Sequence, residues 1–131
     1  MEFGLSQEQI LLQDSINRYL NDQASLDVVR DIAAGDTDDK TIWSGLAEMG
    51  VAGLMIPEEH GGVGLGSMDA VIVAECLGYH VTPSAFLSSA VIAPSVLLSA
   101  GYTNDLADIA AGTFRVGIAF SEAVGAREKA G

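Results

Sequence analysis

The sequence predicts an all-α domain, an orthogonal or up-down bundle of about six helices with a short β segment at its C-terminal end. Three observations support this fold class. Apolar residues recur at helical spacing through most of the 131 residues, and residues that cap or end helices separate these stretches. Ala, Leu, Val and Gly dominate a sequence that is 6% aromatic, which suits closely packed helices. A period of two occurs at one place, near the end of the chain.

The first helix is predicted to begin at Ser6. Ser6 and Gln9 have the spacing of a capping box, and Leu5 and Ile10 have the spacing of a hydrophobic staple. The apolar residues that follow, at positions 12, 16, 19 and 20, fall on one face of a helix. An amphipathic helix is therefore expected here.

Two shorter helices are predicted next, over residues 26–34 and about residues 40–49. Gly35 and Gly50 end them, and the acidic cluster 36–39 marks the turn between them and offers N-caps. The second helix carries its apolar residues, at positions 42, 43, 46 and 49, on one side.

Residues 51–66 contain Pro57 and five glycines, so they are predicted to form an irregular connection. Ser67 is then placed to cap a helix that runs to about Gly78. After a break near residues 81–83, a further helix is expected to reach about residue 100.

This last helix lies in a stretch without charged residues, from Cys76 to Asn104, that is long enough to cross a bilayer. Prolines and serines interrupt it, and no Lys or Arg flanks it, so we interpret it as a segment buried in protein. Pro94 is expected to kink or split it. Thr103 is placed to cap a final helix over residues 104–111.

After Gly112 the periodicity changes. Apolar residues at positions 114, 116, 118 and 120 alternate with other residues, which predicts a strand. A single strand leaves both edges unpaired. We therefore expect residues 1–112 to form a helical domain and residues 113–131 to begin a β-rich domain.

Composition excludes several functions. The net charge of −12, with only six Lys and Arg, disfavours nucleic acid and anionic membrane surfaces as partners. Cys76 is the single cysteine, so no internal disulfide is possible and a reducing, cytoplasmic location is expected. The N-terminus has the pattern of a capped helix rather than that of a signal peptide.

The glycines at positions 61, 62, 64 and 66 match neither a dinucleotide-binding nor a P-loop fingerprint, because no strand precedes them and no Lys follows. His60 follows two glutamates without the spacing of metal ligands, so no metal is expected. His80 is interpreted as a helix-end residue and Cys76 as an unreactive core thiol.

The order of these elements resembles the acyl-CoA dehydrogenase family. The stretch WSGLAEMGVAGLMIPEEHGGVG, residues 43–64, is similar to the pattern W-x-x-L-x-E-x-G, a short apolar segment and P-E-x-x-G-G-x-G. AECLG, residues 74–78, is similar to the A-E-E-L-G of the next helix, and LSQEQ, residues 5–9, to the family's start. Together these pieces cover essentially the whole chain.

The resemblance implies the N-terminal helical domain of an enzyme that also has a β-barrel-like domain and a C-terminal four-helix bundle. It implies FAD as cofactor, α,β-dehydrogenation of an acyl-CoA to the trans-2-enoyl-CoA, and a role in fatty acid or lipid metabolism. It also implies an electron-transfer-flavoprotein-type acceptor and a homo- or hetero-oligomer. The catalytic glutamate of the family belongs to the C-terminal bundle, so no catalytic residue is assigned in this chain, and the chain alone is expected to be inactive.

Two parts of the site are expected within the chain. Phe120 and Ser121 resemble the strand end whose hydroxyl and backbone reach the flavin in the family. Phe86, Ser89 and Ala90 lie in a stretch that resembles the wall of the acyl pocket, although packing in the core explains them equally well.

Residues 123–127, the run AVGAR, depart from the Pro and the Gly/Ser-rich turn of the family pattern. Two alternatives therefore stay open: a non-catalytic partner subunit or interaction module of a heteromeric dehydrogenase, and a flavin monooxygenase or acyl-CoA oxidase of the same superfamily. Substrate chain length and branching are not encoded in any motif that we identify.

Overall fold

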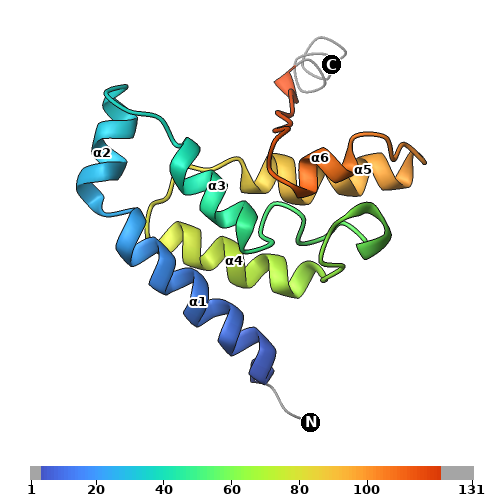
Figure 1. The fold of residues 1–131 in the computed structure, drawn as a ribbon, viewed down its shortest axis with the longest axis horizontal. Coiled ribbons are helices and arrows are strands. Elements are labelled where there is room, and N and C mark those ends of the chain that lie inside the picture. Colours follow the sequence, from blue (N-terminus) through green and yellow to red (C-terminus); the bar gives the residue numbers. More distant parts are fainter. Residues whose placement is uncertain (1–3, 122–131) are drawn as a thin grey trace, which may run out of the picture.

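The computed structural model describes residues 4–121 and places six α-helices in them (Figure 1). The elements in chain order are α1 (Gln7–Gln23), α2 (Leu26–Ala34), α3 (Lys40–Glu48), the 3-10 turn η1 (Glu58–His60), α4 (Ser67–Tyr79), the π-helical segment η2 (Phe86–Ile92), α5 (Ala93–Ser99) and α6 (Leu106–Ala110). The predicted all-α fold is confirmed. Among the described helices, none combines the length and the apolar character that a bilayer crossing requires.

The predicted capping box of α1 is present. The Ser6 hydroxyl accepts a hydrogen bond from the Gln9 backbone N–H at 3.2 Å, and the Gln9 side chain accepts one from the Ser6 N–H at 3.0 Å. Each bond satisfies a donor that a helix start would otherwise leave without a partner. Local sequence therefore fixes where this helix begins.

Helices α1 and α4 lie side by side and run in the same direction (Figure 1). The Gln9 amide donates to Asp69 at 3.1 Å near their N-terminal ends, and Asn17 and His80 are 3.2 Å apart at the other end. The apolar face of α1 packs into the core through Ile16 and Leu20, which are fully buried. Burial of each such side chain contributes about 2 kcal/mol.

The connection between α3 and α4 folds back on itself. Val63 N–H donates to the Gly53 carbonyl at 2.9 Å, Leu65 N–H to the Leu54 carbonyl at 2.8 Å, and Gly64 N–H to the Ile56 carbonyl at 2.9 Å. These bonds hold residues 62–65 against residues 53–56, whose apolar side chains enter the core. The irregular connection predicted from its Pro and Gly content is thus a compact, closed loop.

Pro94 splits the uncharged stretch, as the sequence predicts. Ala93 N–H, just before it, donates to the Ser88 carbonyl, which is an i−5 bond of π-helical type. Pro94 has no N–H to continue the ladder, so the π-helical segment ends and α5 starts there. The uncharged stretch is buried on one face only, because the side chains of Leu87 and Val96 are 64% and 59% exposed.

Two caps differ from the prediction. Gly66, rather than Ser67, is the N-cap of α4, and the Asp69 carboxylate accepts its N–H at 3.1 Å. Helix α6 starts after Asp105, and Thr103 takes part only through its carbonyl, which accepts the Leu106 N–H at 3.3 Å. In α4 the side chain of Asp69, the third residue of the helix, thus accepts the N–H of the N-cap Gly66, and Ser67 does not act as the cap.

Helix α4 ends with a valine in a left-handed conformation. Val81 has a φ of 51°, while Thr82 N–H donates to the Leu77 carbonyl at 2.9 Å and Val81 N–H to the Gly78 carbonyl at 3.1 Å. These two bonds form a Schellman motif, which normally has glycine at this position. A β-branched residue is strained there because its Cβ approaches the backbone.

We expect Val81→Gly to raise the free energy of unfolding by about 1 kcal/mol, because glycine adopts the left-handed conformation without strain. Val81 is 62% exposed, so little burial is lost. The control is Val71→Gly, equally exposed at 60% but within α4, which should lose roughly 0.5 kcal/mol. Urea unfolding of both variants measures this, and a destabilised Val81→Gly would contradict the assignment of strain.

The segment after Gly112 leaves the bundle from the end of α6, on the side of the molecule where α3 begins (Figure 1). Its alternating pattern is partly realised, since Val116 and Ile118 are half-buried and their neighbours are exposed. No strand forms among residues 4–121, and residues 115–120 have no regular secondary structure. A strand requires a hydrogen-bonded partner, and the helical domain offers none to this segment.

Candidate functional site

The five residues singled out from the sequence fall into two groups. Phe86, Ser89 and Ala90 lie on one face of η2 and are buried in the core, with Ser89 and Ala90 fully inaccessible. Phe120 is 58% exposed, and Ser121 beside it is also exposed, at the end of the segment that leaves the bundle. The first group faces the inside of the domain and the second faces outward.

A single hydrogen bond links the region of η2 to the segment that leads to the second group. Val116 N–H donates to the Ser89 hydroxyl at 3.1 Å. The Val116 side chain also packs against a small core cluster that contains Leu106 and Ile109. Both the backbone and the side chain of Val116 are therefore held by the helical domain.

Two further contacts anchor this segment to α3. The Trp43 indole N–H donates to the Gly112 carbonyl at 3.0 Å. The Arg115 guanidinium contacts the Asp39 carboxylate at 2.7 Å and lies over the Trp43 ring, 5.9 Å from its centroid. The charged hydrogen bond and the cation–π contact act on one side chain and hold it in one orientation.

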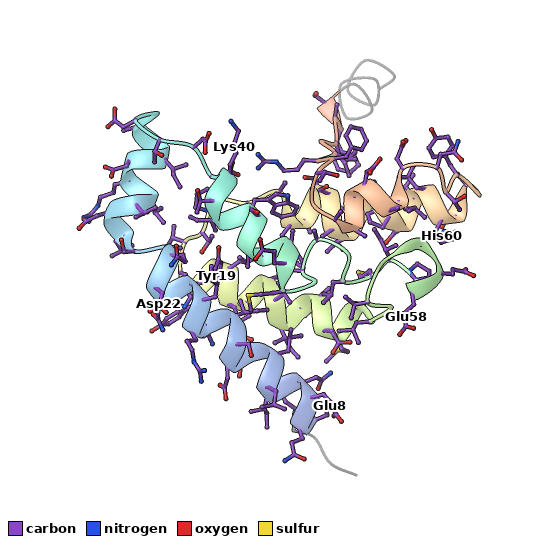
Figure 2. The ribbon with its side chains drawn as sticks, in the orientation of Figure 1. Glu8, Tyr19, Asp22, Lys40, Glu58 and His60 are labelled. Atoms are coloured by element: carbon purple, nitrogen blue, oxygen red, sulfur yellow. The ribbon has the colours of Figure 1, made fainter. Side chains whose placement is uncertain are left out.

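A cavity of about 290 Å³ lies at this anchor and includes Lys40, Trp43, Gly112 and Arg115 in its lining. Figure 2 shows Lys40 at the start of α3, on the side of the molecule where the segment leaves. Both cations are already paired, Lys40 with Asp38 at 3.0 Å and Arg115 with Asp39. The hydrogen bonds from Lys40 lower the pKa of the Asp38 carboxyl. The lining of this cavity is therefore not strongly cationic.

A second groove, of about 410 Å³, lies between α1 and α4 and is bordered by Asn17, Cys76, Tyr79 and His80. Cys76 is buried within its floor. Burial raises the pKa of the Cys76 thiol, and the charge of Glu75 raises it further, so the thiol is neutral near pH 7. The interpretation of Cys76 as an unreactive core thiol agrees with this, and His80 is the C-cap residue of α4, as expected for a helix-end residue.

The glycine-rich loop provides no phosphate cradle. The backbone N–H groups of Gly62, Val63, Gly64 and Leu65 all donate to carbonyls within the loop, so they are not available to bind an anion. His60 is 3.7 Å from the exposed Glu59 in this loop. No group of metal-binding side chains occurs in the part of the chain that the structure describes.

Sequence reasoning missed the roles of Trp43 and Arg115. The sequence indicates Trp43 as an apolar residue of α3 and as the start of the family motif, and it places Arg115 within the alternating pattern after Gly112. Their partners Gly112 and Asp39 are 69 and 76 residues away in sequence. No motif encodes contacts of this separation.

Comparison with known proteins gives consistent matches. The family described as "Acyl-CoA dehydrogenase, N-terminal domain" matches residues 6–104. The acyl-CoA dehydrogenase IpdE2 of Mycolicibacterium smegmatis is 37% identical over 112 residues, which cover 82% of this chain and 35% of that protein. The protein of the same name from Mycobacterium tuberculosis is 33% identical over 96 residues, or 72% of this chain and 30% of that protein. The chain thus spans about a third of the length of the curated relatives it matches.

Proposed function

The chain belongs to the acyl-CoA dehydrogenase family, and we propose that it supplies the N-terminal helical domain of an FAD-dependent acyl-CoA dehydrogenase. In this function the complete protein converts an acyl-CoA thioester to the trans-2-enoyl-CoA and passes electrons to an electron-transfer-flavoprotein-type acceptor. The observation that carries the proposal is the family match over residues 6–104 together with the helical fold. A cytoplasmic location and a homo- or hetero-oligomer are part of the proposal.

We divide the chain into a helical domain, residues 1–112, and the start of a β-rich domain, residues 113–131. In support, the last helix, α6, ends at Ala110, two residues before Gly112, and residues 115–120 have no regular secondary structure. The half-buried Val116 and Ile118 alternate with exposed residues after it, as in a strand with one covered face.

Phe120 and Ser121 are the proposed flavin contacts. An exposed aromatic ring and an adjacent exposed hydroxyl suit a planar, hydrogen-bonding ring system, so the residues present fit the cofactor. Bound FAD would supply the acceptor for the hydride removed from the substrate. The proposed role of this chain is to orient and enclose the flavin and the substrate. No residue of the chain is assigned as the catalytic base.

Helix η2 is the proposed wall of the acyl pocket. Phe86, Ser89 and Ala90 are buried, so they support the wall from inside the domain. Leu87, which is 64% exposed on the opposite face of η2, is the residue of this segment available to an acyl chain. The exposed apolar surface is suited to a ligand of this kind.

The alternative functions are a non-catalytic partner subunit and a flavin monooxygenase or acyl-CoA oxidase. The observation that favours the partner subunit is the departure of residues 123–127 from the family pattern, which lies outside the described residues. A partner subunit would keep the helical domain but would not bind flavin by itself.

The test is to express the chain together with the coding sequence that follows it. We expect a yellow protein with flavin absorbance that reduces an artificial electron acceptor when acyl-CoAs are added. Ser121→Ala should lower flavin affinity about fivefold through the loss of a hydrogen bond. Ser99→Ala, which removes an exposed hydroxyl bonded to the Ser95 carbonyl, is the matched control. Protein without flavin, or without acyl-CoA-dependent reduction, would exclude the proposed activity.

A further inference from the structure

Ser89 is the one buried polar residue among the described core residues. A buried hydroxyl is unfavourable unless it makes a hydrogen bond. Its recorded partner is the Val116 N–H, 27 residues further along the chain, in a segment without regular secondary structure. The hydroxyl therefore joins the buried core to a segment that has no regular secondary structure of its own.

The Ser89 bond acts together with other contacts that hold this segment, among them the Thr113 and Phe114 N–H groups, which donate to the Asp108 carbonyl of α6. The Trp43 indole N–H donates to the Gly112 carbonyl, and the Asp39 carboxylate pairs with the Arg115 guanidinium. Ser89 holds the Val116 backbone itself. The backbone is thus held at Gly112 and at Val116, four residues apart, and these bonds restrict the path of the segment between them.

We propose that Ser89 is a positioning residue, which fixes through the Val116 N–H the path of the segment that presents Phe120 and Ser121 to the flavin. The inference rests on the proposed function, because it assigns Ser89 a role toward the same cofactor. Under this proposal Ser89 does not contact the substrate directly, because it is fully buried and its hydroxyl accepts the Val116 N–H.

Position 89 has specific requirements under this proposal. Alanine keeps the small size but leaves the Val116 N–H without an acceptor. Threonine keeps the hydroxyl but adds a methyl group at a fully buried position, where overpacking is destabilising. Both variants should therefore lose stability, but only Ser89→Ala should also lose the hold on the segment.

The first measurement uses the 131-residue chain and needs no cofactor. Amide hydrogen exchange of Val116, followed by NMR, should be about tenfold faster in Ser89→Ala than in the unchanged chain. Ser95→Ala removes an exposed hydroxyl that bonds the Val91 carbonyl within the same helical region, and it should leave the Val116 exchange unchanged. Equal exchange rates in Ser89→Ala and the unchanged chain would overturn the proposal.

The second measurement uses the complete protein with its following sequence. Ser89→Ala is expected to bind FAD about tenfold more weakly and to shift the flavin absorption band, whereas Ser89→Thr keeps the unchanged affinity and spectrum. Ile42→Val, a core variant distant in sequence from this contact, controls for destabilisation alone. If Ser89→Ala binds FAD as Ile42→Val does, the positioning role is wrong. If the unchanged complete protein binds no FAD, the proposed function fails instead.

Discussion

Replacing Trp43 by alanine is expected to lower the free energy of unfolding by about 4 kcal/mol, the largest effect of any single substitution considered. The Trp43 side chain is 3% exposed and packs in the main core cluster with Ile42 and Leu46. Truncation leaves a large cavity and also removes the hydrogen bond to the Gly112 carbonyl. Urea or thermal unfolding followed by circular dichroism measures this loss.

Trp43→Phe separates the two contributions. Phenylalanine retains most of the buried ring but cannot donate to the Gly112 carbonyl, so the expected loss is about 2 kcal/mol. Because Arg115 lies over the Trp43 ring, both variants should also loosen the segment that follows Gly112. A Trp43→Ala variant less than about 1 kcal/mol less stable than the unchanged chain would show that this residue does not occupy the core.

Gly62→Ala is expected to lower the free energy of unfolding by about 3 kcal/mol. A Cβ atom at position 62 would overlap the Ile56 backbone, with the carbonyl carbon and the Ile56 Cβ both at 2.5 Å. Backbone atoms cannot rotate away as a flexible side chain can. The hydrogen bond between Gly64 and Ile56 would have to open to admit the methyl group.

Gly78→Ala is the matched control for this prediction. Gly78 lies within α4, and a Cβ there meets no atom within 4 Å. The same substitution should therefore raise the free energy of unfolding by about 0.5–1 kcal/mol through helix propensity. Opposite signs at the two positions are expected in chemical denaturation. A tolerated Gly62→Ala would mean that the loop is not closed as described.

These two sites also bear on function. Trp43 anchors the segment that carries the proposed flavin contacts. Gly62 closes the loop that contains Ile56, and Ile56 belongs to the small core cluster against which Val116 packs. Gly62→Ala should reach Phe120 and Ser121 only through this packing, whereas the Trp43 variants also lose the hydrogen bond to the Gly112 carbonyl. In the complete protein, loss of flavin from Gly62→Ala should therefore parallel its loss of stability, in contrast to Ser89→Ala.

The sequence by itself determined the helices and the family. The capping box of Ser6 and Gln9, the helix over residues 26–34 and the split at Pro94 depend on residues three to five apart, so local hydrogen-bonding rules describe them. Even here the rules fail where two residues could cap the same helix: Gly66 rather than Ser67 is the N-cap of α4, and its N–H donates to the Asp69 carboxylate. The motif from Trp43 to Gly64 identified the family because its order and spacing are specific.

Only the tertiary structure decided which residues hold the proposed site. Ser89 resembled part of a ligand pocket in the sequence, but packing buries it and directs its hydroxyl to the Val116 backbone. Gly62 resembled an ordinary turn glycine, but its requirement comes from the Ile56 backbone pressed against it. The alternating residues after Gly112 encode a strand, yet none forms among residues 4–121, because a strand needs a partner that local sequence does not supply. Contacts across 27 or 69 residues depend on how the helices pack, and no local pattern records that packing.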